Sequence, residues 1–93
     1  MPNDPSSGIR LLYFYRKQCR VCVSLKPKLE EFSRNYPQFP LQMIDLEEQP
    51  HLAGQWLVFS YPAILIIQND REMKRWVRYF SILEIEEFVT QWR

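Results

Sequence analysis

The order of apolar and polar positions along the chain predicts seven elements joined by short polar turns. Runs of β-branched, aliphatic and aromatic residues predict β-strands over residues 9–15, 41–46, 63–68 and 73–80. Apolar residues at helical spacing, or a proline suited to a first turn, predict helices over residues 20–35, 50–56 and 82–91. The predicted order is therefore β-α-β-α-β-β-α.

The connections between these elements predict how the strands pair. A helix joins the first two strands, so we expect them to be parallel, with a right-handed crossover. Asn69-Asp70 between two strand-like runs is typical of a tight hairpin, so the last two strands should be antiparallel. The predicted fold class is α/β, with a four-stranded mixed sheet flanked by helices on both faces.

Local signals mark the first and last helices. The expected apolar face of the first helix consists of Val21, Leu25, Leu29 and Phe32. Pro27 falls inside this pattern, where its missing N–H should kink the helix. Ser81 and Glu84 form the pattern of a capping box at the start of the last helix. The side chains of the last helix available for burial are Leu83, Ile85, Phe88, Val89 and Trp92.

Composition limits the class of protein. A chain of 93 residues, 46% of them hydrophobic, forms one domain with a modest core. We expect a flexible N-terminal segment over residues 1–8 and a single domain over 9–93. With 12 Lys and Arg against 11 Asp and Glu, no nucleic-acid partner is predicted. No signal-like segment or membrane-length apolar run is visible, so the expected location is the cytoplasm, without membrane contact.

Cys19-Arg20-Val21-Cys22 is the pattern with the most chemical content. It lies between a predicted buried strand and a predicted helix, where two cysteines can close a small disulfide ring. The helix N-terminus favours a thiolate at the first cysteine, which points to thiol–disulfide exchange. A zinc site would need about four ligands, and beyond the two cysteines only the distant His51 is available, so no metal is predicted.

Several marks in this order make the chain similar to the thioredoxin superfamily in a short form. The Cys19–Cys22 pair follows the first core strand, and Pro27 matches the kinking proline of the active-site helix. Pro62 lies close to where the family places its cis-proline, before an antiparallel strand. Asp45 matches the end of the family's second core strand. The resemblance implies a thioredoxin-like fold that lacks the usual extra N-terminal strand and helix.

The resemblance also implies roles for four residues. Cys19 would be the exposed attacking thiol and Cys22 the buried resolving thiol of a thiol–disulfide oxidoreductase. Pro62, if cis, would face the pair, and the Tyr61 backbone would bind an extended substrate by β-augmentation. Arg20 is itself a departure from the family's typical Cys-Gly-Pro-Cys motif, and its fixed positive charge beside Cys19 should favour the thiolate. Protein or small-molecule disulfides are the implied substrates and a thioredoxin-reductase-like protein the implied donor, with no bound cofactor.

The sequence departs from the family pattern near the expected site. Tyr13 and Leu41 stand where thioredoxins carry a buried Asp and its Lys partner, so deprotonation of the resolving thiol needs another base. Glu47 and water are the alternatives. Residues 78–80, Arg-Tyr-Phe, replace the glycine that usually follows the hairpin, which should give the substrate groove a bulkier rim.

Two other functions remain open from the sequence. A non-catalytic thioredoxin-like adaptor would use the same groove or a hydrophobic rim to bind a partner, and the Cys19→Ser variant would distinguish it from an enzyme. A glutaredoxin is the other short form of the fold. Its Gly-Gly-Asp segment is replaced by Ser81-Ile82-Leu83, which argues against a standard glutathione site.

Overall fold

The computed structural model describes residues 8–91, and these fold into seven elements in the predicted order. The elements are β1 (Ile9–Tyr15), α1 (Arg20–Asn35), β2 (Leu41–Asp45), α2 (Pro50–Trp56), β3 (Ala63–Gln68), β4 (Arg71–Val77) and α3 (Ile82–Thr90). The fourth strand begins and ends earlier than the predicted 73–80, and the other bounds agree within a residue. The expectations for residues 1–7 and for Trp92 lie outside the described residues.

One mixed sheet holds the four strands in the order β2-β1-β3-β4. As predicted, β1 runs parallel to β2 and β3 runs antiparallel to β4, while β1 and β3 pair antiparallel at the centre. The β3–β4 turn places Asn69 and Asp70 at φ 55° and 63°. Two successive positive φ values suit a tight hairpin turn, and these two residue types tolerate them.

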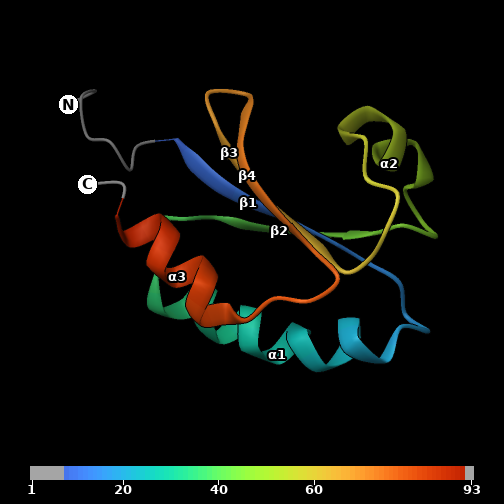
Figure 1. Ribbon diagram of the computed structural model, residues 1–93, viewed down its shortest axis with the longest axis horizontal. Helices are drawn as coiled ribbons and strands as arrows, with labels where there is room; N and C mark the ends of the chain where they lie inside the picture. The colour runs from blue at the N-terminus through green and yellow to red at the C-terminus, as the bar shows by residue number, and fades with distance from the viewer. Residues whose placement is uncertain (1–7, 92–93) are drawn as a thin grey trace.

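The sheet separates two apolar cores. Figure 1 shows α1 and α3 on one face of the sheet and α2 on the other. Alternate β1 residues supply the two sides, with Leu11 and Tyr13 toward α1 and α3, and Leu12 and Phe14 toward α2. The buried core under α1 and α3 also contains Ile9, Leu25, Leu29, Phe32, Phe39, Ile64, Ile66, Ile85 and Val89. The covered faces explain why β1 and β3 read as continuous apolar runs.

Two residues expected in the core face solvent instead. Val21 is 48% exposed and Leu83 is 60% exposed, so both predictions are wrong. In α1 the buried position belongs to Cys22, which shares a helical face with Leu25, Leu29 and Phe32. In α3 the buried residues are Ile85 and Val89, one turn apart, and Leu83 lies on the opposite side of that helix.

The helix ends agree with their local sequence signals. The Ser81 backbone N–H donates to the Glu84 carboxylate over 2.9 Å, and the Glu84 N–H donates to the Ser81 hydroxyl over 3.3 Å, which completes the predicted capping box. Pro50 occupies the first turn of α2, where its missing N–H has no intrahelical partner to lose. No helix within residues 8–91 has the length and apolar character needed to span a membrane.

Candidate active site

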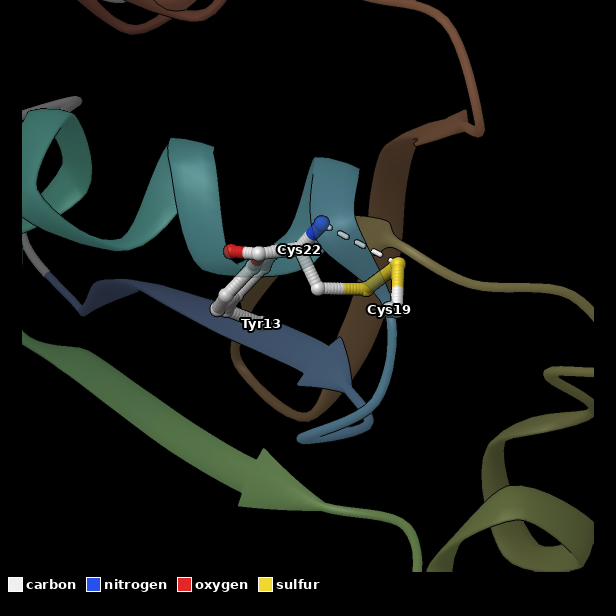
Figure 2. The surroundings of a disulfide bond; sticks show 3 residues. All are labelled: Tyr13, Cys19 and Cys22. Atoms are coloured by element: carbon white, nitrogen blue, oxygen red, sulfur yellow. Dashed lines mark hydrogen bonds between the residues drawn. A yellow bond between two sulfur atoms is a disulfide. The ribbon is translucent and has the colours of Figure 1, made fainter.

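The two cysteines lie at the junction between β1 and α1. Cys19 is the N-cap residue of α1, with extended backbone at φ −84° and ψ 114°, and Cys22 falls within the first turns of the helix. A disulfide joins them, and their Cα atoms are 5.1 Å apart (Figure 2). Cys22 is only 1% exposed, whereas Cys19 is half-buried. The two sulfurs therefore occupy unlike surroundings, one inside the core and one at the surface.

The Cys19 sulfur also caps the helix. The Cys22 backbone N–H donates to Cys19 Sγ over 3.0 Å, drawn as the dashed line in Figure 2. This places Sγ at the position where an N-cap side chain accepts a free helical N–H. The positive end of the helix dipole favours negative charge at the same point. Backbone geometry alone therefore favours a thiolate at Cys19 when the pair is reduced.

Tyr13 forms the inner wall of the site. It lies on β1, beneath the first turns of α1 (Figure 2). Its buried hydroxyl donates to the Cys22 carbonyl oxygen over 2.6 Å. Burial, and secondarily the charge of a nearby ionised Tyr15, raises the pKa of the Tyr13 hydroxyl well above its usual value. Tyr13 therefore stays protonated and acts as a hydrogen-bond donor, not as a base for Cys22. Tyr15 stacks against it at 5.5 Å between ring centroids and is only partly buried.

A small cavity of about 140 Å³ opens beside Cys19. It is lined by Cys19, Val21, Tyr61, Pro62, Arg78 and Tyr79. The structure thus brings together three of the site residues predicted from sequence: Cys19, Tyr61 and Pro62. The other two, Arg20 and Cys22, adjoin Cys19 along the helix but do not line the cavity.

Two loops, one just before β3 and one just after β4, form the wall of the cavity opposite Cys19. The Tyr61–Pro62 peptide bond, just before β3, is cis, as the resemblance implied. The Arg78 N–H, just after β4, donates to the Pro62 carbonyl oxygen over 2.7 Å. This bond ties the end of the hairpin to the proline. The sequence predicts a bulky rim at residues 78–80, but it gives no signal that Val21 lines the cavity, because the helical spacing of Val21 predicts a core position.

Most charges around the site pair with one another. The Arg16 guanidinium contacts the Glu47 carboxylate at 3.2 Å and lies 5.6 Å from the centre of the Tyr61 ring. Lys17 lies 3.5 Å from Glu48 and 3.7 Å from Asp45, and its hydrogen bond to Glu48 raises the pKa of Lys17. Within residues 8–91, neither Arg20 nor Arg78 has an ion pair or a side-chain hydrogen bond.

Glu47 does not reach the buried cysteine. Its carboxylate accepts hydrogen bonds from Arg16 and Gln18, each at 3.2 Å, at the exposed surface. No contact between Glu47 and Cys22 occurs in the part of the chain that the structure describes. Of the two alternatives for the base, this geometry favours water. His51 is exposed on α2, and residues 8–91 contain no group of three or more His, Cys, Asp or Glu side chains arranged to hold a metal.

A family model matches almost the whole chain. The thioredoxin model covers residues 3–91, including both cysteines and Pro62. The chain belongs to the thioredoxin family. Thioredoxin from Buchnera aphidicola is 30% identical over 87 residues, which is 92% of this chain and 81% of that protein. Thioredoxin from Chlamydia trachomatis is 29% identical over 70 residues, 75% of this chain and 69% of its own length.

Solved structures agree with this membership. Thioredoxin 1 from Thermosipho africanus superposes with a TM-score of 0.82 and 32% identity, covering 88% of this chain and 91% of that one. Fasciola hepatica thioredoxin superposes with a TM-score of 0.85 over 95% of this chain and 85% of that one; at 19% identity it supports the fold alone. The thioredoxin fold predicted from the sequence is confirmed.

Family and geometry together establish the type of reaction. Thioredoxins are thiol–disulfide oxidoreductases that act on protein disulfides and are reduced by thioredoxin reductase. This member keeps both cysteines of the motif, and they stand at disulfide distance. The chain is therefore a thiol–disulfide oxidoreductase, in agreement with the first of the functions considered from the sequence and not with the adaptor.

Proposed function

We propose that Cys19 is the attacking thiol of this oxidoreductase and that Cys22 is the resolving thiol. The observation that carries the assignment is their unequal exposure: Cys19 lines an open cavity, whereas Cys22 is sealed in the core. Only the first sulfur is accessible to the disulfide of another molecule. The capping N–H of Cys22, the helix dipole and the adjacent charge of Arg20 all favour the thiolate at Cys19.

The exchange then proceeds in two balanced steps. The Cys19 thiolate attacks one sulfur of the substrate, forming a mixed disulfide while the second substrate sulfur leaves as a thiolate. Cys22, after losing its proton to water, attacks the Cys19 sulfur, and the first substrate sulfur leaves as a thiolate. The substrate has gained two electrons, and the Cys19–Cys22 disulfide has formed.

The substrate lies against Tyr61 and Pro62 in this proposal. Both residues line the cavity with Cys19, and an extended peptide beside them would pair with the Tyr61 backbone, as in β-augmentation. Such binding gives affinity through main-chain hydrogen bonds and leaves specificity to the rim. Protein or small-molecule disulfides are the proposed substrates. A thioredoxin-reductase-like donor in a reducing compartment such as the cytoplasm would restore the dithiol.

A redox titration with thiol alkylation tests this proposal directly. The purified protein is equilibrated with dithiol buffers of graded potential, and the alkylated fraction of Cys19 and Cys22 is measured. We expect one reversible two-electron couple. A midpoint of about −270 mV indicates a reductant, and a midpoint above about −180 mV indicates an oxidant or isomerase. If no reversible couple within the protein appears, the proposed roles of the two cysteines are wrong.

A further inference from the structure

We propose that Arg78 is a specificity-determining residue, which favours polypeptide disulfides with an Asp or Glu beside the reacting cysteine. This inference rests on the proposed function, because it describes the partner of the same site. Arg78 lines the cavity together with Cys19 and is exposed to solvent, so a substrate that approaches the sulfur passes close to this residue.

The backbone at Arg78 is the first observation. Its φ is 71°, in the left-handed region that residues other than Gly, Asn and Asp seldom adopt. The Arg78 N–H is held by the Pro62 carbonyl at 2.7 Å, and the next residue, Tyr79, donates to the Val77 carbonyl at 2.9 Å. Strained backbone of this kind persists where the surroundings fix it and concentrates at functional sites. A long cationic side chain is thus kept at a position that favours glycine.

The charge balance is the second observation. Arg16 and Lys17, the other cations near the junction, are paired with Glu47 and Glu48. The guanidinium of Arg78 has no such partner among residues 8–91, and no Asp or Glu lines the cavity. Arg20, equally unpaired, follows Cys19 directly. The entrance therefore carries uncompensated positive charge, and a carboxylate on the substrate is the complementary group.

Arginine is well suited to this recognition. Its planar guanidinium binds a carboxylate through two parallel N–H···O bonds, and these charge-assisted bonds are stronger than neutral ones. Charges at the rim of an interface act mainly on the association rate and on its dependence on salt. The expected preference for an acidic neighbour over a basic one is about threefold to tenfold in kcat/KM at low salt.

The apolar surface around the cavity favours a polypeptide over a small disulfide. Val21 is 48% exposed and Tyr79 is 86% exposed, and both line the cavity. Tyr61, 42% exposed, lies on the same lining. Residues on either side of a peptide cysteine would cover these side chains, which a molecule small enough for about 140 Å³ would leave in water.

The test uses the full chain and a set of disulfide-bridged peptides that differ only in the residue after one cysteine, which is Glu, Gln or Lys. Their kcat/KM for reduction is measured at low and high salt. We expect kcat/KM to decrease from the Glu peptide to the Gln peptide to the Lys peptide. The ratio of the Glu value to the Lys value should become smaller in high salt. Arg78→Gln should reduce the Glu-to-Lys ratio toward one, and Arg78→Lys should keep part of it. Arg78→Gly gives the same charge change without the strained φ.

Arg71→Gln is the matched control. It also removes one exposed positive charge, but at the β3–β4 turn, at the far end of β4 from Arg78. This variant should keep the wild-type ratio. Equal rates on the Glu and Lys peptides, or an unchanged ratio in Arg78→Gln, would overturn the inference. Oxidised glutathione serves as a small disulfide that carries carboxylates. The assignment to polypeptide substrates would be overturned if glutathione were reduced as fast as the Glu peptide and if that rate depended equally on Arg78. Wild-type protein that reduces no peptide would instead refute the proposed function.

Discussion

The inner and outer sides of the Cys19–Cys22 disulfide differ in almost every physical respect. Inside, Cys22 is buried, and its carbonyl oxygen accepts a hydrogen bond from the Tyr13 hydroxyl, which is also inaccessible to solvent. Outside, Cys19 faces a cavity whose walls include the strongly exposed Tyr79. One covalent bond thus joins a sulfur fixed by the core to a sulfur at the surface. Apart from the two cysteines, which both take part in exchange, substitutions on the inner side should change stability, and those on the outer side should change exchange and selectivity.

The largest effect should come from replacing each cysteine with serine. Both variants should lose essentially all turnover, because each sulfur forms a bond in one of the two steps. Cys22→Ser should still form a mixed disulfide with substrate and accumulate it, since Cys19 remains accessible. Cys19→Ser should form none. Non-reducing electrophoresis after incubation with a disulfide substrate measures the adduct; an equal adduct on Cys19→Ser would show that the inner sulfur is reactive after all.

Truncation of one tyrosine on each side of the disulfide compares the two sides by the free energy of unfolding. Tyr13→Ala should lower the free energy of unfolding by about 3–5 kcal/mol, as for other large aromatic residues removed from a core. Tyr79→Ala, at an exposed position, should change it by no more than about 0.5 kcal/mol. Urea unfolding of both variants measures the difference. Similar losses in the two would contradict the contrast between the sides.

The Tyr13 hydroxyl gives a smaller effect that depends on pH. Above pH about 10 the unfolded chain ionises at Tyr13, whereas burial keeps the folded chain protonated. The unfolded state then binds fewer protons, so this residue's contribution to stability falls by about 1.4 kcal/mol per pH unit. The Tyr13→Phe variant lacks this decrease in stability at high pH. At neutral pH the variant should be less stable than wild type by about 1 kcal/mol, because the hydrogen bond to the Cys22 carbonyl oxygen is lost.

Unfolding of wild type and Tyr13→Phe in urea between pH 8 and pH 11 measures this difference. The gap between the two proteins should stay constant up to pH about 10 and then shrink. A gap that stays constant through pH 11 would mean that Tyr13 ionises equally in the folded and unfolded chains.

The smallest effect on stability is expected at Arg78 on the outer side. Arg78→Gly relieves a left-handed φ, which is worth about 1–2 kcal/mol, but it gives the unfolded chain more freedom, which costs about 0.4–1 kcal/mol. Because the two terms oppose each other, the net change in the free energy of unfolding should be a gain of about 1 kcal/mol or less. A loss well above 1 kcal/mol in urea unfolding would place Arg78 among the structural residues of the inner side.

The sequence predicted most reliably what local chemistry determines. The Asn69-Asp70 turn and the cap formed by Ser81 and Glu84 depend only on residues close together in the chain, and both are confirmed. The face that a helix buries depends on its neighbours in space. Val21 and Leu83 were therefore placed wrongly in the core, although the helices that carry them were predicted correctly.

The site shows the same difference between features that a local motif predicts and features that depend on neighbours in space. The cysteine pair and Pro62 follow from motif and resemblance, and the cavity brings Cys19 and Pro62 together. The hydrogen bond from Tyr13 to Cys22 and the closure of the rim by Arg78 join segments far apart in sequence. Their geometry depends on sheet register and on a backbone φ that no local pattern specifies.

The outer strand β4 has a consequence for the behaviour of the protein in concentrated solution. Among residues 8–91 no strand pairs with its outer side, so it borders the sheet with one row of backbone N–H and C=O groups, which is the usual starting point for edge-to-edge aggregation. Its sequence places four charged side chains along this border: Arg71, Glu72, Lys74 and Arg75. Docking a second sheet there would strip these charged side chains of water, which disfavours the contact. Within residues 8–91 the opposite border of the sheet is β2, which has only five residues, so both borders of this described sheet are poor templates for fibre growth.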